Sequence, residues 1–104
     1  MTVELLYFDG CPSYQRLLPS LRELIAELAP GAELELRRIE SIEDAERAQF
    51  LGSPTVRVEG VDVDAGAAER GDFGLKCRLY RSDGVTSPLP PEEWIREALA
   101  RSER

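Results

Sequence analysis

The stretch VELLYFDGCP, residues 3–12, decides how the start of this chain folds. Residues 3–8 form an apolar run typical of a buried strand, and Asp9-Gly10 ends it. Cys11-Pro12 then opens a segment with helical periodicity, so the sequence predicts Cys11 at a helix N-terminus. Unpaired backbone N–H groups and the positive end of the helix dipole favour a thiolate there. Cys11 is therefore a candidate nucleophile, and a small buried apolar residue is its alternative role.

The segments that follow alternate between strand and helix patterns. Ser41, with Asp44 three residues later, resembles a capping box and starts a short helix. Apolar residues at three- and four-residue steps mark the first and last helices, and alternation marks the strands. We predict strands over residues 2–8, 32–37, 55–58 and 61–63, and helices over 12–28, 41–50 and 91–101, the last packing through Trp94, Ile95, Ala98 and Leu99. The predicted class is α/β, a mixed central sheet flanked by helices.

The part of the chain between the last predicted strand and the last helix is harder to interpret. Residues 64–74 are rich in Gly, Ala and charge, which predicts a surface loop. Residues 75–80 alternate apolar and basic side chains, as in a further strand or an extended edge segment. Residues 82–84 form a turn signal, and residues 101–104 are expected to fray.

Composition limits the possible functions. The 104 residues predict one domain, and 13 basic against 20 acidic residues give a net charge of −7. That charge disfavours nucleic acid and anionic membrane as partners. The chain has no histidine, which excludes Ser-His-Asp and Cys-His catalysis, and two cysteines alone make a poor metal site. With no apolar stretch of membrane-spanning length, we expect a cytoplasmic protein without a bound metal.

Three features give the chain a resemblance to the thioredoxin and glutaredoxin superfamily. Cys11-Pro12-Ser13-Tyr14 resembles the active-site tetrad, with Tyr14 in place of the second cysteine. Pro19 matches the proline that thioredoxins carry eight residues after the first cysteine. Gly52-Ser53-Pro54-Thr55, followed at once by a strand, resembles the loop with a cis proline that faces this cysteine. The resemblance covers residues 1–63 and the last helix, and it implies one thioredoxin-like domain over residues 1–104.

The resemblance also implies roles for these residues. Cys11 is the expected nucleophile, and Pro12, Ser13 and Tyr14 line the substrate site. A cis bond before Pro54 is expected to leave the N–H and C=O of Ser53 free to pair with an extended peptide or thiol ligand. Tyr14 cannot resolve a mixed disulfide, and it either bonds to the Cys11 sulfur, lines a groove or packs as an aromatic residue.

Cys77 is the other sulfur of the chain, and two arrangements are open for it. In one, the loop 64–76 folds over the active site and brings Cys77 to Cys11 as a resolving thiol, because sequence separation does not prevent a bridge. In the other, Cys77 lies in the core. Lys76 and Arg78 either favour its thiolate or are solvated edge charges.

We therefore expect a thiol-dependent redox protein in which Cys11 forms a mixed disulfide with a protein or low-molecular-weight thiol. Glutathione or another small thiol is the expected co-substrate, with no other cofactor. One alternative is a non-catalytic binding module of the same fold. A weaker one is a resemblance to organomercurial lyases, in which two cysteines and an acid, here Asp9, cleave a carbon–mercury bond.

Overall fold

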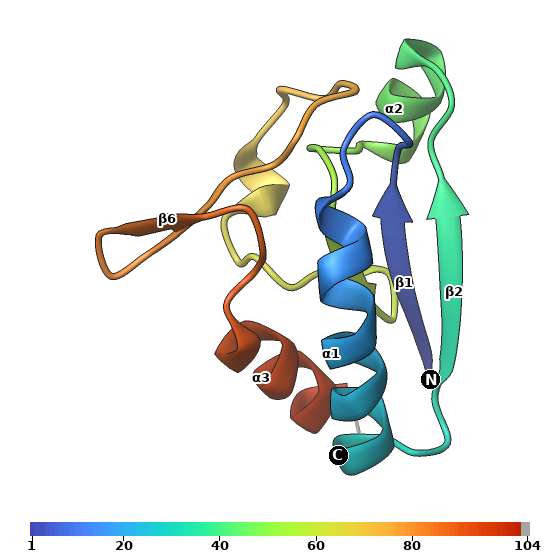
Figure 1. Cartoon of the computed structure of the whole chain (residues 1–104), viewed down its shortest axis with the longest axis vertical. Helices are drawn as coiled ribbons and strands as arrows, with labels where there is room; N and C mark the ends of the chain where they lie inside the picture. The colour runs from blue at the N-terminus through green and yellow to red at the C-terminus, as the bar shows by residue number, and fades with distance from the viewer. Residues whose placement is uncertain (103–104) are drawn as a thin grey trace.

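The core of the structure, a computed structural model that describes residues 1–102, is a four-stranded mixed sheet (Figure 1). The strand order is β2-β1-β3-β4; β2 runs parallel to β1, β3 antiparallel to β1, and β4 antiparallel to β3. The strands are β1 (Thr2–Tyr7), β2 (Glu33–Arg38), β3 (Thr55–Val58) and β4 (Val61–Asp62). The four predicted strands of this sheet are confirmed.

Helices cover both faces of the sheet. In Figure 1, α1 (Ser13–Leu28) and α3 (Glu92–Ser102) lie side by side, and they pack with β1 and β3 in one apolar cluster. Successive strand side chains point to opposite faces, so Leu6 of β1 turns away from Leu5. Leu6 belongs to a second cluster with residues of α2 (Ile42–Ala48) and with Phe50. Each face of the sheet is therefore covered by an apolar cluster. The connection between β1 and α1 joins two elements of the first cluster.

Local signals explain where the helices begin and end. Ser41 caps α2 as predicted, because its Oγ accepts a hydrogen bond of 3.0 Å from the Asp44 N–H. The helix ends at Ala48, before the predicted Phe50, because Gln49 adopts a left-handed conformation with φ 55°. Pro12 directly precedes α1, and Pro19 lies inside it.

The segment between β4 and α3 contains structure that the sequence did not predict. A short 3₁₀ turn, η1 (Ala67–Glu69), interrupts the predicted loop. A hairpin of β5 (Tyr80–Ser82) and β6 (Val85–Ser87) forms a separate two-stranded sheet. Asp83 and Gly84 turn it with φ of 52° and 78°, the geometry that an Asp-Gly hairpin turn favours. Of the predicted segment 75–80, only Tyr80 lies in a strand.

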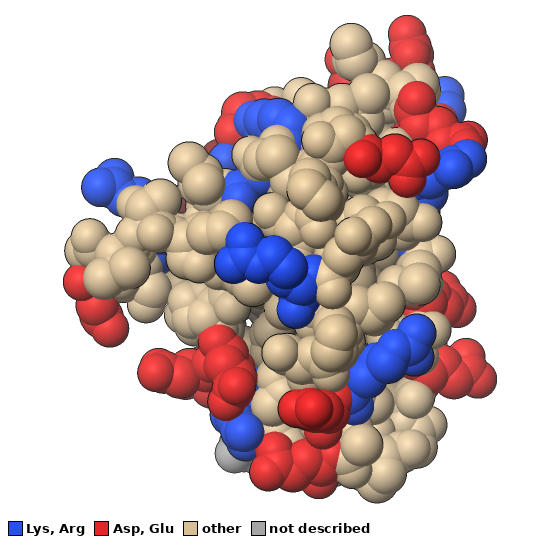
Figure 2. Space-filling model, viewed as in Figure 1, with Lys and Arg blue, Asp and Glu red and all other residues tan. Residues whose placement is uncertain are grey.

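The last helix confirms its predicted packing face, with Ile95, Ala98 and Leu99 buried. Of residues 101–104, for which fraying is predicted, residues 101 and 102 belong to α3, and residues 103–104 lie outside the described part of the chain. No helix within residues 1–102 is long and apolar enough to cross a membrane. Figure 2 shows basic and acidic side chains interspersed over the face viewed, as expected for dispersed charge.

Candidate functional site

Cys11 lies in the connection between β1 and α1, as predicted. Its N–H donates to the Phe8 carbonyl at 3.3 Å, which closes a turn after the strand. Two residues later α1 begins at Ser13, whose Oγ lies 3.7 Å from the Cys11 sulfur. Cys11 itself is completely buried. The strand thus delivers one sulfur to the N-terminal end of a 16-residue helix.

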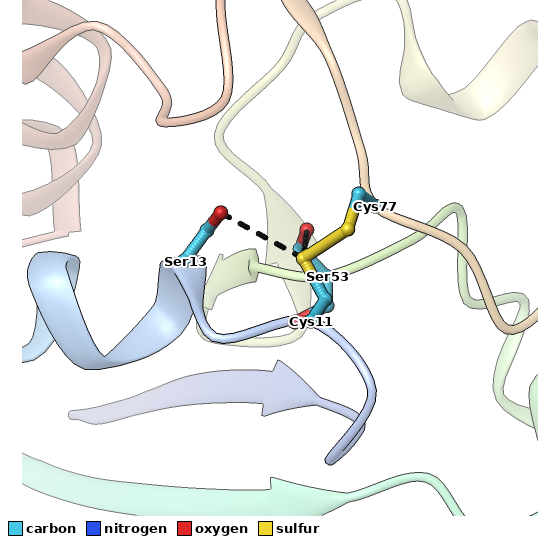
Figure 3. The surroundings of a disulfide bond; sticks show 4 residues. All are labelled: Cys11, Ser13, Ser53 and Cys77. Atoms are coloured by element: carbon cyan, nitrogen blue, oxygen red, sulfur yellow. Dashed lines mark hydrogen bonds between the residues drawn. A yellow bond between two sulfur atoms is a disulfide. The ribbon is translucent and has the colours of Figure 1, made fainter.

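A disulfide joins Cys11 to Cys77, so of the two predicted positions for Cys77 the one close to Cys11 is observed (Figure 3). The Cα atoms are 5.7 Å apart, within the range that a disulfide requires, although 66 residues separate the two positions. Unlike Cys11, Cys77 is exposed. The bridge thus joins a buried sulfur on one side to a residue at the surface on the other.

The loop around Pro54 forms the third side of the site. The Ser53-Pro54 peptide bond is cis, as predicted. The Ser53 carbonyl oxygen lies 3.6 Å from the Cys11 sulfur, and Ser53 is fully buried. This loop therefore faces the cysteine, and both belong to one site.

The backbone of Ser53 is not free, and this corrects the expectation that it awaits a ligand. Its N–H donates to the Lys76 carbonyl at 2.8 Å, and its carbonyl accepts from the Arg78 N–H at 2.9 Å. Together they form a parallel bridge between Ser53 and Cys77. The chain's own residues 76–78 thus occupy the backbone edge that was predicted to bind an extended partner.

Gly52 permits this close approach. A Cβ atom there would lie 2.9 Å from the Arg78 Cβ, closer than real Cβ atoms come to other atoms, and 3.0 Å from the Lys76 carbonyl oxygen, which is unusually tight. Its backbone φ of 127° is also one that residues other than glycine rarely adopt. A glycine before Ser53 is therefore needed for residues 76–78 to pair with the loop.

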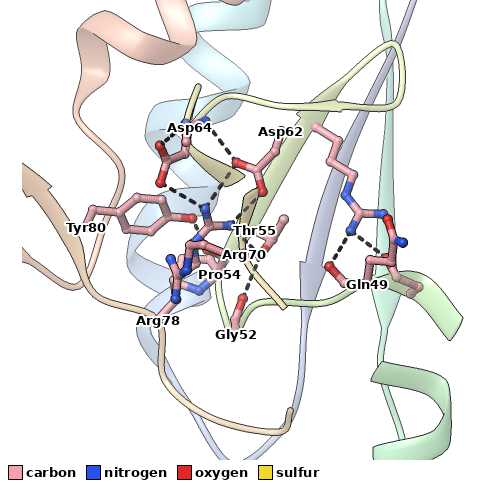
Figure 4. Close-up of polar contacts among 12 residues, drawn as sticks. Gln49, Gly52, Pro54, Thr55, Asp62, Asp64, Arg70, Arg78 and Tyr80 are labelled. Carbon is pink, nitrogen blue, oxygen red and sulfur yellow. Dashed lines mark hydrogen bonds and ion pairs between the residues drawn. The ribbon is translucent and has the colours of Figure 1, made fainter. Parts of the chain in front are cut away.

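A buried ionic cluster holds the same segment from its other side (Figure 4). Arg78 is 1% exposed; its Nη1 donates to Asp62 at 2.8 Å and to the Thr55 hydroxyl at 3.0 Å. Its Nη2 reaches Asp64 at 3.3 Å, and its guanidinium carbon lies 4.5 Å from the centre of the Tyr80 ring. Burial opposes the charge, yet Tyr80 and the two aspartates leave the pKa of Arg78 raised. The guanidinium therefore stays charged and fixed in place.

Tyr80 and Thr55 connect this cluster to the cis-proline loop. The Tyr80 hydroxyl donates to the Pro54 carbonyl, and the Thr55 hydroxyl donates to the Gly52 carbonyl at 2.6 Å. Burial raises the pKa of Tyr80 well above its usual value, so the phenol remains protonated. Hydrogen bonds thus run from the segment that carries Cys77 to the residues on both sides of Ser53.

The remaining predicted site residues lie apart from the sulfurs or engage other partners. Tyr14 stacks on Tyr7 with ring centres 4.1 Å apart, which is the aromatic packing role among its predicted alternatives. Pro12 is exposed at the start of α1. Asp9 pairs with Arg38 at the surface, at 3.2 Å. That pairing gives the lyase-like alternative no acid directed at the disulfide.

The charges beside Cys77 also have partners other than its sulfur. Lys76 pairs with Asp72 at 2.8 Å, and Arg78 points into the acidic cluster. Their side chains therefore serve to hold the segment, and the predicted activation of Cys77 by them has no contact to support it. Within residues 1–102, no group of three or more histidine, cysteine or acidic side chains could hold a metal ion.

Sequence reasoning missed the cluster of Arg78, Asp62, Asp64, Thr55 and Tyr80. The available signal was the alternation in residues 61–64, where each of two aspartates directly follows a valine. Acidic residues at alternate positions usually face solvent, so only the position of Arg78 in space gives them a partner.

No protein-family model matches this chain, and neither a search of curated proteins nor one of solved structures found a match. Function must therefore be argued from the site itself.

Proposed function

We propose that this chain is a thioredoxin-like thiol–disulfide redox protein whose working pair is Cys11 and Cys77. The observation that carries the proposal is the disulfide itself, which joins a cysteine at a helix N-terminus to a cysteine beside a cis-proline loop. The βαβαββα order of the main sheet and its helices, with a cysteine directly after the first strand, agrees with the order predicted from the sequence. These features support the redox assignment when they are taken together, because none of them would support it alone.

The two sulfurs supply a complete exchange reaction. A thiolate of a partner attacks one sulfur of the bridge, and the other sulfur leaves as a thiolate, giving a mixed disulfide. A second thiol then attacks the partner's sulfur, so that two partner thiols become one disulfide and the protein holds two thiols. The two electrons pass from the partner to the bridge, and no other cofactor is needed. Because the two cysteines lie opposite each other, one can resolve a mixed disulfide formed on the other, which is the role that Tyr14 cannot perform.

The position of Cys11 favours this chemistry. A helix N-terminus stabilises the thiolate that forms when the bridge opens. The Ser13 hydroxyl, 3.7 Å from the sulfur, can donate to that anion. Ser53 and Pro54 fix the opposite wall, so the thiolate that forms remains within reach of Cys77.

A turnover assay tests the proposal. The substrate is a fluorescent peptide linked to glutathione by a disulfide, with free glutathione as the reductant. We expect the native protein to accelerate release of the peptide thiol over the uncatalysed exchange. The Cys11→Ser/Cys77→Ser variant should lose that acceleration, with Ser20→Ala, an exposed serine of α1, as a control. Equal rates for the native protein and the Cys11→Ser/Cys77→Ser variant would contradict the proposal.

A binding module with a structural disulfide is the second candidate, and one observation favours it. Residues 76–78 already occupy the Ser53 backbone, as a permanent part of the fold would. A bridge that closes a loop of this length can stabilise a chain by about 4 kcal/mol through the unfolded state. For this candidate, the thiols of the native protein would exchange no faster than those of an unfolded chain.

A further inference from the structure

The two cysteines of the bridge differ sharply in exposure, and this asymmetry has a consequence for the order of the reaction. Cys11 has 0% of its surface exposed, whereas Cys77 is an exposed residue. A thiolate must approach the sulfur that it attacks in line with the bond that breaks. At the buried Cys11, surrounding protein atoms block this approach.

Protein atoms also close the approach to the Cys11 sulfur. The Ser53 carbonyl oxygen lies 3.6 Å away. Ser53 is fully buried and its carbonyl is fixed by the Arg78 N–H, so it cannot turn aside. Figure 3 shows the sulfur enclosed between Ser13, Ser53 and Cys77. A partner thiolate therefore has no open path to the Cys11 sulfur, whereas that sulfur can leave as a thiolate stabilised by the helix N-terminus.

The segment that carries Cys77 is anchored on both sides of the cysteine. Lys76 accepts from Ser53, Arg78 donates to Ser53, and the Arg78 side chain is held in the buried ionic cluster. None of these contacts involves a sulfur atom. Opening of the disulfide therefore leaves Cys77 at the surface and opposite Cys11.

We infer that partner thiols attach to and leave from the protein through Cys77, while Cys11 is the buried thiolate that opens and closes the bridge. This inference rests on the proposed redox function and reverses the expectation that Cys11 carries the mixed disulfide. The partner is an accessible thiol, either a small one such as glutathione or a cysteine at a protein surface.

Reduction of the bridge takes two exchange steps. The partner thiolate forms a bond to the Cys77 sulfur, the Cys11–Cys77 bond breaks, and its electron pair stays on Cys11. A second partner thiolate then attacks the sulfur attached to Cys77, which releases the partner disulfide and the Cys77 thiolate. In the opposite direction, Cys77 attacks a partner disulfide and Cys11 displaces the partner from it.

Mapping of the trapped intermediate tests the inference. The oxidised native protein is mixed briefly with glutathione, quenched with acid, alkylated with N-ethylmaleimide and digested for mass spectrometry. At the earliest quench time we expect glutathione on the peptide of Cys77 and the alkyl group on the peptide of Cys11. Glutathione on Cys11 with the alkyl group on Cys77 would overturn the inference and leave the redox function standing. An intact bridge with no mixed disulfide would overturn both.

Single-cysteine variants give a second measurement. In native conditions, Cys11→Ser should form a mixed disulfide with glutathione disulfide about tenfold or more faster than Cys77→Ser, because access limits Cys11. In urea the two variants should differ far less, which controls for the intrinsic reactivity of each thiol. An equal or faster native reaction of the Cys77→Ser variant would contradict the inference.

Discussion

Removal of the Arg78 side chain should strongly destabilise the protein. Arg78→Ala leaves the carboxylates of Asp62 and Asp64, which are 13% and 22% exposed, without their shared cation. Loss of one partner of a buried ion pair costs about 3–5 kcal/mol. Because both aspartates keep some contact with water, we expect the lower end, about 3 kcal/mol. For a domain of this size that corresponds to a fall in Tm of roughly 12–24 °C.

Thermal and urea unfolding of the oxidised protein would measure this loss. Arg70→Ala is the matched control, because Arg70 pairs with Asp72 in the same region at the surface and should cost at most about 1 kcal/mol. Adding Asp62→Asn and Asp64→Asn to Arg78→Met should recover much of the stability, since no unpaired charge remains buried. A loss for Arg78→Ala no larger than for Arg70→Ala would refute the anchoring role of the cluster.

Three further perturbations test the surroundings of the disulfide. Thr55→Val removes two buried hydrogen bonds and should cost about 1–3 kcal/mol in urea unfolding, whereas Ser53→Ala should cost much less, because the buried Ser53 Oγ has no hydrogen-bond partner among residues 1–102. Gly52→Ala should weaken the contact with residues 76–78 and speed reduction of the bridge, while Gly71→Ala, where a Cβ meets nothing within 4 Å, should change neither stability nor reduction rate. The raised pKa of Tyr80 predicts that the protein keeps its full stability below pH 10.0, the usual tyrosine pKa, and loses stability as the pH rises above it. Tyr80→Phe should lose the hydrogen bond to Pro54 but show a shallower decline of stability with pH. Identical pH profiles for the two proteins would count against this explanation.

The first 63 residues were largely predictable because local signals specify them. The apolar run of β1, the Asp9-Gly10 break and the periodicity of α1 place Cys11 without knowledge of the rest of the fold. The same holds for the Ser41 cap and for the turn between β3 and β4, whose residues suit only a few backbone conformations. The cis form of Pro54 followed from the resemblance, not from the residues themselves.

The segment from Asp64 to Ser87 was not predictable in the same way. Its place is set by contacts between residues far apart in the chain, such as Ser53 with Lys76 and Arg78 with Asp62. A short segment that alternates apolar and basic residues, such as residues 75–80, suits a solvated edge segment as well as it suits a strand. The proximity of Cys77 to Cys11 therefore could be offered only as one of two arrangements.

An equilibrium redox titration of the native protein distinguishes a working disulfide from a structural one. The protein is equilibrated with buffers of reduced and oxidised thiol, the thiol content is read by mass spectrometry after alkylation, and folding is followed by circular dichroism. We predict a reversible two-electron transition between about −300 and −120 mV, the span that separates structural bridges from strongly oxidising exchange proteins, with the fold unchanged at both ends. A bridge that opens only below about −300 mV, or only as the chain unfolds, would contradict the account and identify a structural disulfide.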